Sequence, residues 1–176
     1  MNKNKTAVIL VGHGGLPSDM PSDIVEKFMR LHKSRIKAGT EITSEEIELD
    51  NTIRKWERTP ETDPYKSGLE DLATHMEPLL KNFILKTAYN EFCYPGIENA
   101  ISELAEDSFS KIILVTTMIT RGGSHSEKEI PEELKKFEIQ HPTIDIQYAW
   151  PFCMKSFAEF LGKHAQSFDK EVSVKN

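Results

Sequence analysis

The sequence predicts a single α/β domain, residues 1–176, in which four parallel strands form a sheet with helices on both faces. Short apolar runs rich in β-branched residues recur along the chain, and helical patterns separate most of them. Such runs, without polar alternation, are typical of strands buried on both faces of a parallel sheet. Strands that alternate with helices indicate crossover connections, which place helices on both faces of the sheet.

The expected strands are residues 6–11, 83–88, 111–117 and 144–149. Asp63 and Pro64 mark the start of a helix, because aspartate is a favoured N-cap and proline is tolerated at the first helical position. Apolar residues at three- and four-residue spacing within residues 69–79 give this helix one apolar face. Further helices are expected near residues 95–104, 126–137 and 154–166.

Residues 16–63 depart from this regular order, because connections between neighbouring elements are normally short. Apolar residues at helical spacing predict a first helix from about Ser22, and a second helix is expected from about Ser44 to Arg58. We interpret the stretch as a helical insertion after the first strand, within the same domain. Because it begins three residues after His13, we expect it to lie over the carboxyl edge of the sheet.

One histidine, His125, follows the third expected strand in a polar and Gly-rich stretch, residues 120–124. Ser126 and Glu129 stand in the S-x-x-E spacing of a capping box, which predicts a helix start after the histidine. Pro131 leaves the exact start open, because proline is best tolerated in the first turn of a helix. In open α/β sheets, ligands bind at the carboxyl ends of the strands. His125 is therefore a candidate functional residue, and a hydrogen-bonded loop histidine is the alternative.

His13 and Glu91 occupy the corresponding positions after the first and second strands. The glycines around His13 give it little cover, so its ring can reach out of the loop. If the first strand lies between the second and third, the flavodoxin-like order, the three residues come from adjacent strands about 4.8 Å apart. Two imidazoles and a carboxylate suit a first-row divalent metal ion and leave positions open for a substrate. For Glu91 alone, a solvated surface carboxylate is the alternative.

The amino-acid composition limits the classes of binding partner and the cellular compartment that we expect for this protein. The formal net charge of −6 gives no general attraction to nucleic acid or to an anionic membrane. The two cysteines lack C-x-x-C spacing, which favours a reduced compartment without a disulfide framework. The chain shows neither the apolar region of a signal peptide nor a run of membrane-spanning length. We therefore expect a cytoplasmic protein.

Two other classes of enzyme lack their motifs in this chain. A hydrolase would use the Gly14-Gly15 loop as an oxyanion hole and Cys93 or Ser124 as the nucleophile, but no G-x-S-x-G elbow is present. A dinucleotide-binding enzyme would carry G-x-G-x-x-G, which is also absent. We therefore expect no organic cofactor.

Three stretches resemble the small class II tetrapyrrole chelatases, the sirohydrochlorin cobaltochelatases and ferrochelatases of cobalamin and sirohaem biosynthesis. They are VGHG after the first strand, AYNEFCYPGIENAI after the second and GGSHSEKEIPEEL after the third. The resemblance covers the first strand and roughly residues 64–162. It implies a chelatase-like fold and a chelatase that inserts Co²⁺, Fe²⁺ or Ni²⁺, as its metal substrate, into a polycarboxylated tetrapyrrole.

The resemblance also implies roles for individual residues. His13, Glu91 and His125 correspond to the metal-binding residues of the family. The two histidines would hold the metal or accept the protons of the pyrrole nitrogens, and the sequence does not separate these roles. Arg121 lies beside the site and would meet substrate carboxylates, with a loop-surface arginine as the alternative. Gly15 departs from the family, which usually has a serine or a similar residue there.

Two further expectations concern the whole protein. Single-domain members of the family pair as homodimers, which implies a homodimer here. The competing function is that of a non-catalytic metal or tetrapyrrole carrier with the same fold. Such a carrier would keep the two histidines but would not catalyse metal insertion.

Overall fold

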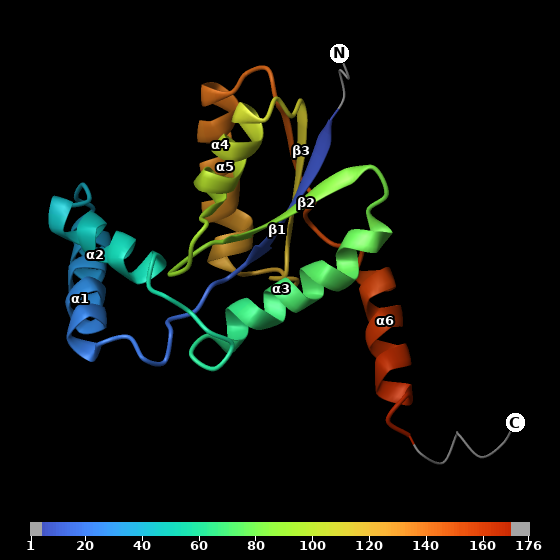
Figure 1. Cartoon of the computed structure of the whole chain (residues 1–176), viewed down its shortest axis with the longest axis horizontal. Helices are drawn as coiled ribbons and strands as arrows, with labels where there is room; N and C mark the ends of the chain where they lie inside the picture. The colour runs from blue at the N-terminus through green and yellow to red at the C-terminus, as the bar shows by residue number, and fades with distance from the viewer. Residues whose placement is uncertain (1–4, 170–176) are drawn as a thin grey trace, which may run out of the picture.

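The computed structural model describes residues 5–169, and its centre is one parallel sheet (Figure 1). The strands lie in the order β2-β1-β3-β4, and each neighbouring pair is parallel. They are β1 (Thr6–Gly12), β2 (Phe83–Tyr89), β3 (Lys111–Thr116) and β4 (Asp145–Tyr148). The predicted four-stranded parallel sheet is confirmed, with β1 between β2 and β3 as the flavodoxin-like order requires.

Helices cover both faces of the sheet, as predicted. On one face, α4 (Ile97–Glu106) and α5 (Ile130–Gln140) pack on β1 and β3 and form the main core. On the other face, α3 (Pro64–Met76) packs beside β2 and continues into a short 3-10 turn, η1 (Glu77–Leu79). Asp63 is the N-cap of α3, because its carboxylate accepts the Lys66 N–H at 2.9 Å.

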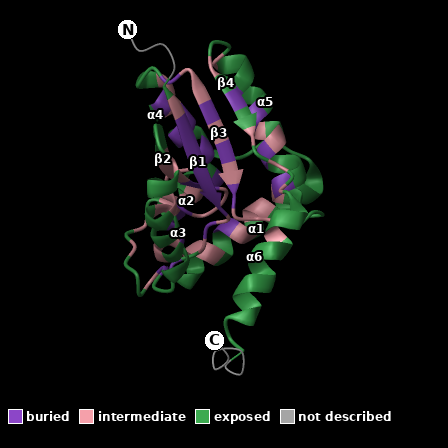
Figure 2. Ribbon diagram, turned by 90° about the vertical axis from the view of Figure 1, so that its right-hand side faces the viewer, coloured by how far each residue is buried: buried purple, intermediate pink, exposed green. Residues whose placement is uncertain are grey.

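The central strand is the most buried one, and Figure 2 shows this directly. Alternate residues of β1 enter the two cores: Ile9 joins the main core, and Leu10 packs with Leu69 of α3. β3 differs from the prediction of a strand buried on both faces. Its residues Ile112 and Leu114 are fully buried, but the alternate residues are only partly buried, because α3 covers that face beside β2.

The insertion after β1 contains two helices, α1 (Ser22–Ala38) and α2 (Ser44–Arg54), as predicted. They share a small core around Phe28 and Ile53, and Phe92 joins it from the loop after β2. The second helix ends at Arg54, before the predicted end at Arg58, because the Trp56 N–H turns back to the Ile53 carbonyl.

The predicted capping box after β3 is wrong. A π-helical turn, η2 (His125–Glu129), begins at the histidine itself, and Ser124 makes no side-chain capping bond. The Ser126 hydroxyl instead donates to the Gly123 carbonyl at 3.5 Å, and Glu129 turns towards His125. The reason is that the π-helical turn aligns residues four apart, so the carboxylate reaches the imidazole rather than a backbone N–H.

The last helix, α6 (Met154–Gln166), extends away from the sheet in both views (Figures 1 and 2). None of its residues is buried in this chain. Within residues 5–169, no helix combines the length and the apolar character needed to cross a membrane.

Candidate metal centre

His13, Glu91 and His125 meet at the carboxyl edge of the sheet. Each offers one ligand atom, and these atoms all lie within 4.8 Å of one another. The Nε2 atom of His13 lies 3.2 Å from Nε2 of His125 and 3.7 Å from Oε2 of Glu91. The three side chains therefore converge as the strand order requires. Their role as metal ligands stays a prediction.

Main-chain hydrogen bonds fix the loop after β1 against the loop after β2. The Asn90 N–H donates to the Gly12 carbonyl at 2.9 Å, and the Glu91 N–H donates to the His13 carbonyl at 2.8 Å. These bonds continue the β1–β2 ladder past the ends of the strands. From α3, the Tyr65 hydroxyl accepts the His13 N–H at 2.7 Å. His13 and Glu91 are thus held at neighbouring backbone positions.

Gly14 is the residue that lets these two loops approach. Its φ is +92°, a conformation that side-chain-bearing residues rarely adopt. A Cβ atom at this position would lie 1.8 Å from the carbonyl oxygen of Glu91. Both the backbone conformation and the contact therefore require glycine.

The hydrogen bonds of the two rings determine where their protons lie. Nδ1 of His13 is 2.8 Å from the Gly14 carbonyl oxygen, and Nδ1 of His125 is 2.8 Å from Oε2 of Glu129. A carbonyl and a carboxylate can only accept, so each Nδ1 carries a proton, and in the neutral form of each ring Nε2 keeps a lone pair. The Asn90 amide nitrogen also lies 2.9 Å from Nδ1 of His125, but the bond to the carboxylate prevails because it is charge-assisted.

The two Nε2 lone pairs therefore face each other beside the Glu91 carboxylate, and this arrangement suits a cation. Two ligands bound to one tetrahedral ion at about 2.0–2.1 Å lie about 3.3 Å apart. The observed separation between the Nε2 atoms is 3.2 Å. The His13 side chain is 39% exposed and the Glu91 side chain 28% exposed, so an ion can reach the site from solvent.

The Glu129 carboxylate keeps its charge next to His125. Burial raises the pKa of the Glu129 carboxyl, but the interactions with His125, Ser124 and Asn90 outweigh burial, so this pKa lies below its ordinary value. An ionised Glu129 holds the ring of His125 in one tautomer and makes its Nε2 a better ligand.

The structure also describes one further residue predicted for this site and several that sequence reasoning missed. Arg121 is exposed in the turn that precedes His125, and its role towards a substrate stays a prediction. Sequence reasoning missed Tyr65 and Asn90 as partners of the two histidines. It did not name Glu129 as a partner of His125, although the four-residue spacing between them was a usable signal for a side-chain pair.

Comparison with known proteins supports the fold. A structure of a CbiX protein from Marinobacter aquaeolei VT8, proposed to act in cobalamin (vitamin B12) biosynthesis, aligns with a TM-score of 0.55 and 15% identity. The alignment covers 98% of this chain and 100% of that chain. A search of curated proteins finds no match.

Two structures of SirB from Bacillus subtilis are also similar. The sirohydrochlorin chelatase SirB of subspecies spizizenii, in complex with cobalt, aligns with a TM-score of 0.42 and 16% identity over 84% of this chain. SirB from Bacillus subtilis with Fe³⁺ gives a TM-score of 0.47 and 16% identity over 84% of this chain. The present chain spans 43% and 40% of the lengths of these two chains.

The family model CbiX matches residues 61–164, which is more than half of the 176-residue chain. The matched range contains Glu91 and His125, whereas His13 lies before it. The match confirms the resemblance to the class II chelatases that the three sequence motifs carry. The chain belongs to the CbiX family.

Proposed function

We propose that this protein is a chelatase that inserts a divalent metal ion, Co²⁺, Fe²⁺ or Ni²⁺, into a sirohydrochlorin-type tetrapyrrole in cobalamin or sirohaem biosynthesis. The observation that carries the proposal is the meeting of two Nε2 lone pairs and a carboxylate at an open edge of the sheet. Membership of the CbiX family supports it. The expected cytoplasmic location and the absence of an organic cofactor remain predictions.

The chemistry follows from the hydrogen bonds of the site. His13, His125 and Glu91 would hold the metal substrate, and the Glu91 carboxylate would balance part of its charge. Three protein ligands leave coordination positions for pyrrole nitrogens, which must lose two protons as they bind. A histidine that releases the metal can accept one of these protons at Nε2. The ionised Glu129 would stabilise the imidazolium that forms at His125.

A direct assay tests this function. Purified protein is mixed with sirohydrochlorin and one metal ion, Co²⁺, Fe²⁺ or Ni²⁺, in parallel reactions. The absorption spectrum of each reaction is followed against a blank without protein. We expect at least one ion to enter the macrocycle faster than in the blank. Binding of the metal or the tetrapyrrole without faster conversion would refute the enzyme and support the carrier. The same panel identifies the preferred ion.

We also propose that two copies pair through α6. The apolar residues of α6 are exposed in one chain: Phe160 is 60% exposed, and Leu161 is 47% exposed. Each large aromatic side chain can bury about 150–250 Å². A stable interface buries roughly 1,200–2,000 Å² in total, so each α6 and the surface that receives it would have to supply about half of that area.

Light scattering checks the dimer. We expect a mass near twice that of the 20.1 kDa chain for the wild type. Leu161→Glu places a charge on the apolar side of α6 and should give a monomer, whereas Lys155→Glu, which adds a carboxylate to the same helix without removing an apolar residue, should remain a dimer. A wild-type protein that stays monomeric throughout the micromolar range would rule out this pairing.

A further inference from the structure

We propose that Arg58 of the insertion is a positioning residue that sets the separation between His13 and Glu91. The inference rests on the metal centre of the proposed function, but it concerns how the centre is held and not which tetrapyrrole is used. It gives the insertion a role in metal binding.

The guanidinium of Arg58 bonds to both ligand-bearing loops at once. Its Nη1 donates to the Gly15 carbonyl at 2.8 Å, two residues after His13. Its Nη2 donates to the carbonyl of Phe92, the residue that follows Glu91. A lysine cannot reproduce this bridge, because a guanidinium presents N–H groups on separate nitrogens in a rigid fork, whereas the three N–H groups of an ammonium lie on one nitrogen.

Arg58 is itself held in place from several sides. Its Nη2 also donates to the Ile53 carbonyl of α2 at 3.1 Å, and its Nη1 forms an ion pair with Asp63. The side chains of Arg58 and Asp63 are only 4% and 2% exposed. Asp63 is also the N-cap of α3, and α3 carries the Tyr65 hydroxyl that accepts the His13 N–H. One buried ion pair therefore joins the insertion, α3 and both loops.

A second arginine reinforces the loop that carries Glu91. Arg54, the last residue of α2, donates to the carbonyls of Asn90 and Cys93, each at 3.3 Å. With the bond from Arg58 to Phe92, three backbone carbonyls around Glu91 are tied to arginines of the insertion. The geometry of this loop thus depends on contacts that reach it from outside the sheet.

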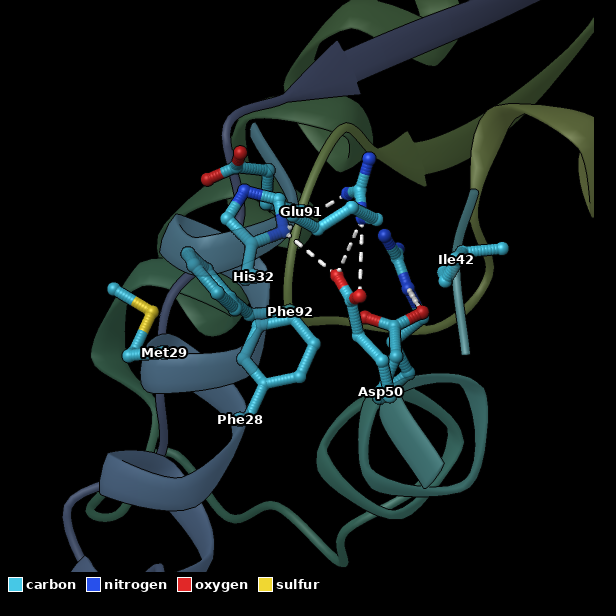
Figure 3. Close-up of a pocket in the computed structure, with 10 residues that line it drawn as sticks. Phe28, Met29, His32, Ile42, Asp50, Glu91 and Phe92 are labelled. Carbon is cyan, nitrogen blue, oxygen red and sulfur yellow. Dashed lines mark hydrogen bonds and ion pairs between the residues drawn. The ribbon is translucent and has the colours of Figure 1, made fainter. Parts of the chain in front are cut away.

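The surroundings of Glu91 explain why the bonds from the arginines to this loop matter. A cavity of about 280 Å³ lies between the insertion and the loop after β2, and Glu91, Phe92 and Arg54 are among its lining residues (Figure 3). The cavity leaves Glu91 without close packing on this side. The position of its backbone, which the arginines hold, therefore limits how closely its carboxylate can approach Nε2 of His13, 3.7 Å away.

Arg58→Lys tests the inference, with Arg35→Lys as the matched control. Arg35 also forms an ion pair inside the insertion, with the buried Glu46, but none of its described bonds reaches either loop. Co²⁺ serves as the probe, because its visible absorption reports the number and geometry of its ligands. Affinity is measured by titration, and folding by circular dichroism and Tm.

We expect Arg58→Lys to lower Co²⁺ affinity about tenfold or more and to change the Co²⁺ spectrum, in the range known for outer partners of metal ligands. Arg35→Lys should lower Tm and leave the Co²⁺ spectrum unchanged. In a Glu91→Ala background, Arg58→Lys should cause little further loss of affinity, because it acts through Glu91. If Arg58→Lys does not fold, Arg54→Lys provides the same comparison with a smaller expected loss.

Three results would overturn the inference. The first is a folded Arg58→Lys protein with the Co²⁺ spectrum and affinity of the wild type. The second is a double variant, Glu91→Ala with Arg58→Lys, in which the two losses of Co²⁺ affinity simply add. The third is a wild type that does not bind Co²⁺. A wild type that binds Co²⁺ but does not metallate sirohydrochlorin would refute the proposed chelatase alone, because the positioning role is measured by binding.

Discussion

Replacing Gly14 by alanine is expected to lower the free energy of unfolding by about 2 kcal/mol or more and to abolish Co²⁺ binding. The backbone at this residue has a φ of +92°, which costs about 1–2 kcal/mol for an L-residue with a side chain. The added Cβ would also lie 1.8 Å from the Glu91 carbonyl oxygen, so the loop after β2 must move. That movement separates Glu91 from His13. Urea unfolding and Co²⁺ titration measure the two effects.

Gly39→Ala is the matched control for Gly14→Ala. Gly39 has a φ of +63°, and a Cβ there would meet no atom within 4 Å. It therefore carries the backbone cost alone, about 1–2 kcal/mol, at a position that ends α1. We expect Gly39→Ala to bind Co²⁺ like the wild type. Equal losses of stability in both variants, with Co²⁺ binding retained in both, would contradict the proposed role of Gly14.

Replacing His125 by alanine is expected to abolish metal insertion and to lower Co²⁺ affinity by at least about 100-fold, while the fold remains intact. Loss of an outer partner of a metal ligand alone costs about 10–100-fold in affinity, and loss of a ligand should cost more. The fold should survive because the described contacts of the His125 ring are to His13, Asn90 and Glu129, outside the hydrophobic core clusters. Co²⁺ titration, the chelatase rate and circular dichroism measure these effects.

His75→Ala is the control for His125→Ala. His75 lies on α3 beside Asp71. Its side chain is 75% exposed, compared with 24% for His125, so the control variant loses a solvent-exposed histidine. We expect wild-type Co²⁺ affinity and chelatase rate from it. A folded His125→Ala protein with full activity would show that the imidazole is not a metal ligand.

Much of the fold could be predicted from the sequence, because it depends on patterns of residues that lie close together in the chain. Continuous apolar runs marked the strands, and apolar residues at helical spacing marked the helices that cover them. Parallel strands bring their carboxyl ends to one edge, so three polar residues at strand ends could be expected to converge. The convergence of His13, Glu91 and His125 follows from that local placement, once the order of the strands is right.

The sequence by itself thus determined the parallel sheet, the helical insertion and the three residues that meet at the sheet edge. Only the tertiary structure decided how they are held. Arg58 reaches the Phe92 carbonyl across 34 residues of sequence, and no periodic pattern encodes a hydrogen bond to a distant backbone oxygen. The exposed apolar side of α6 required knowing where the helix lies. Such features depend on long-range packing, which local propensities do not specify.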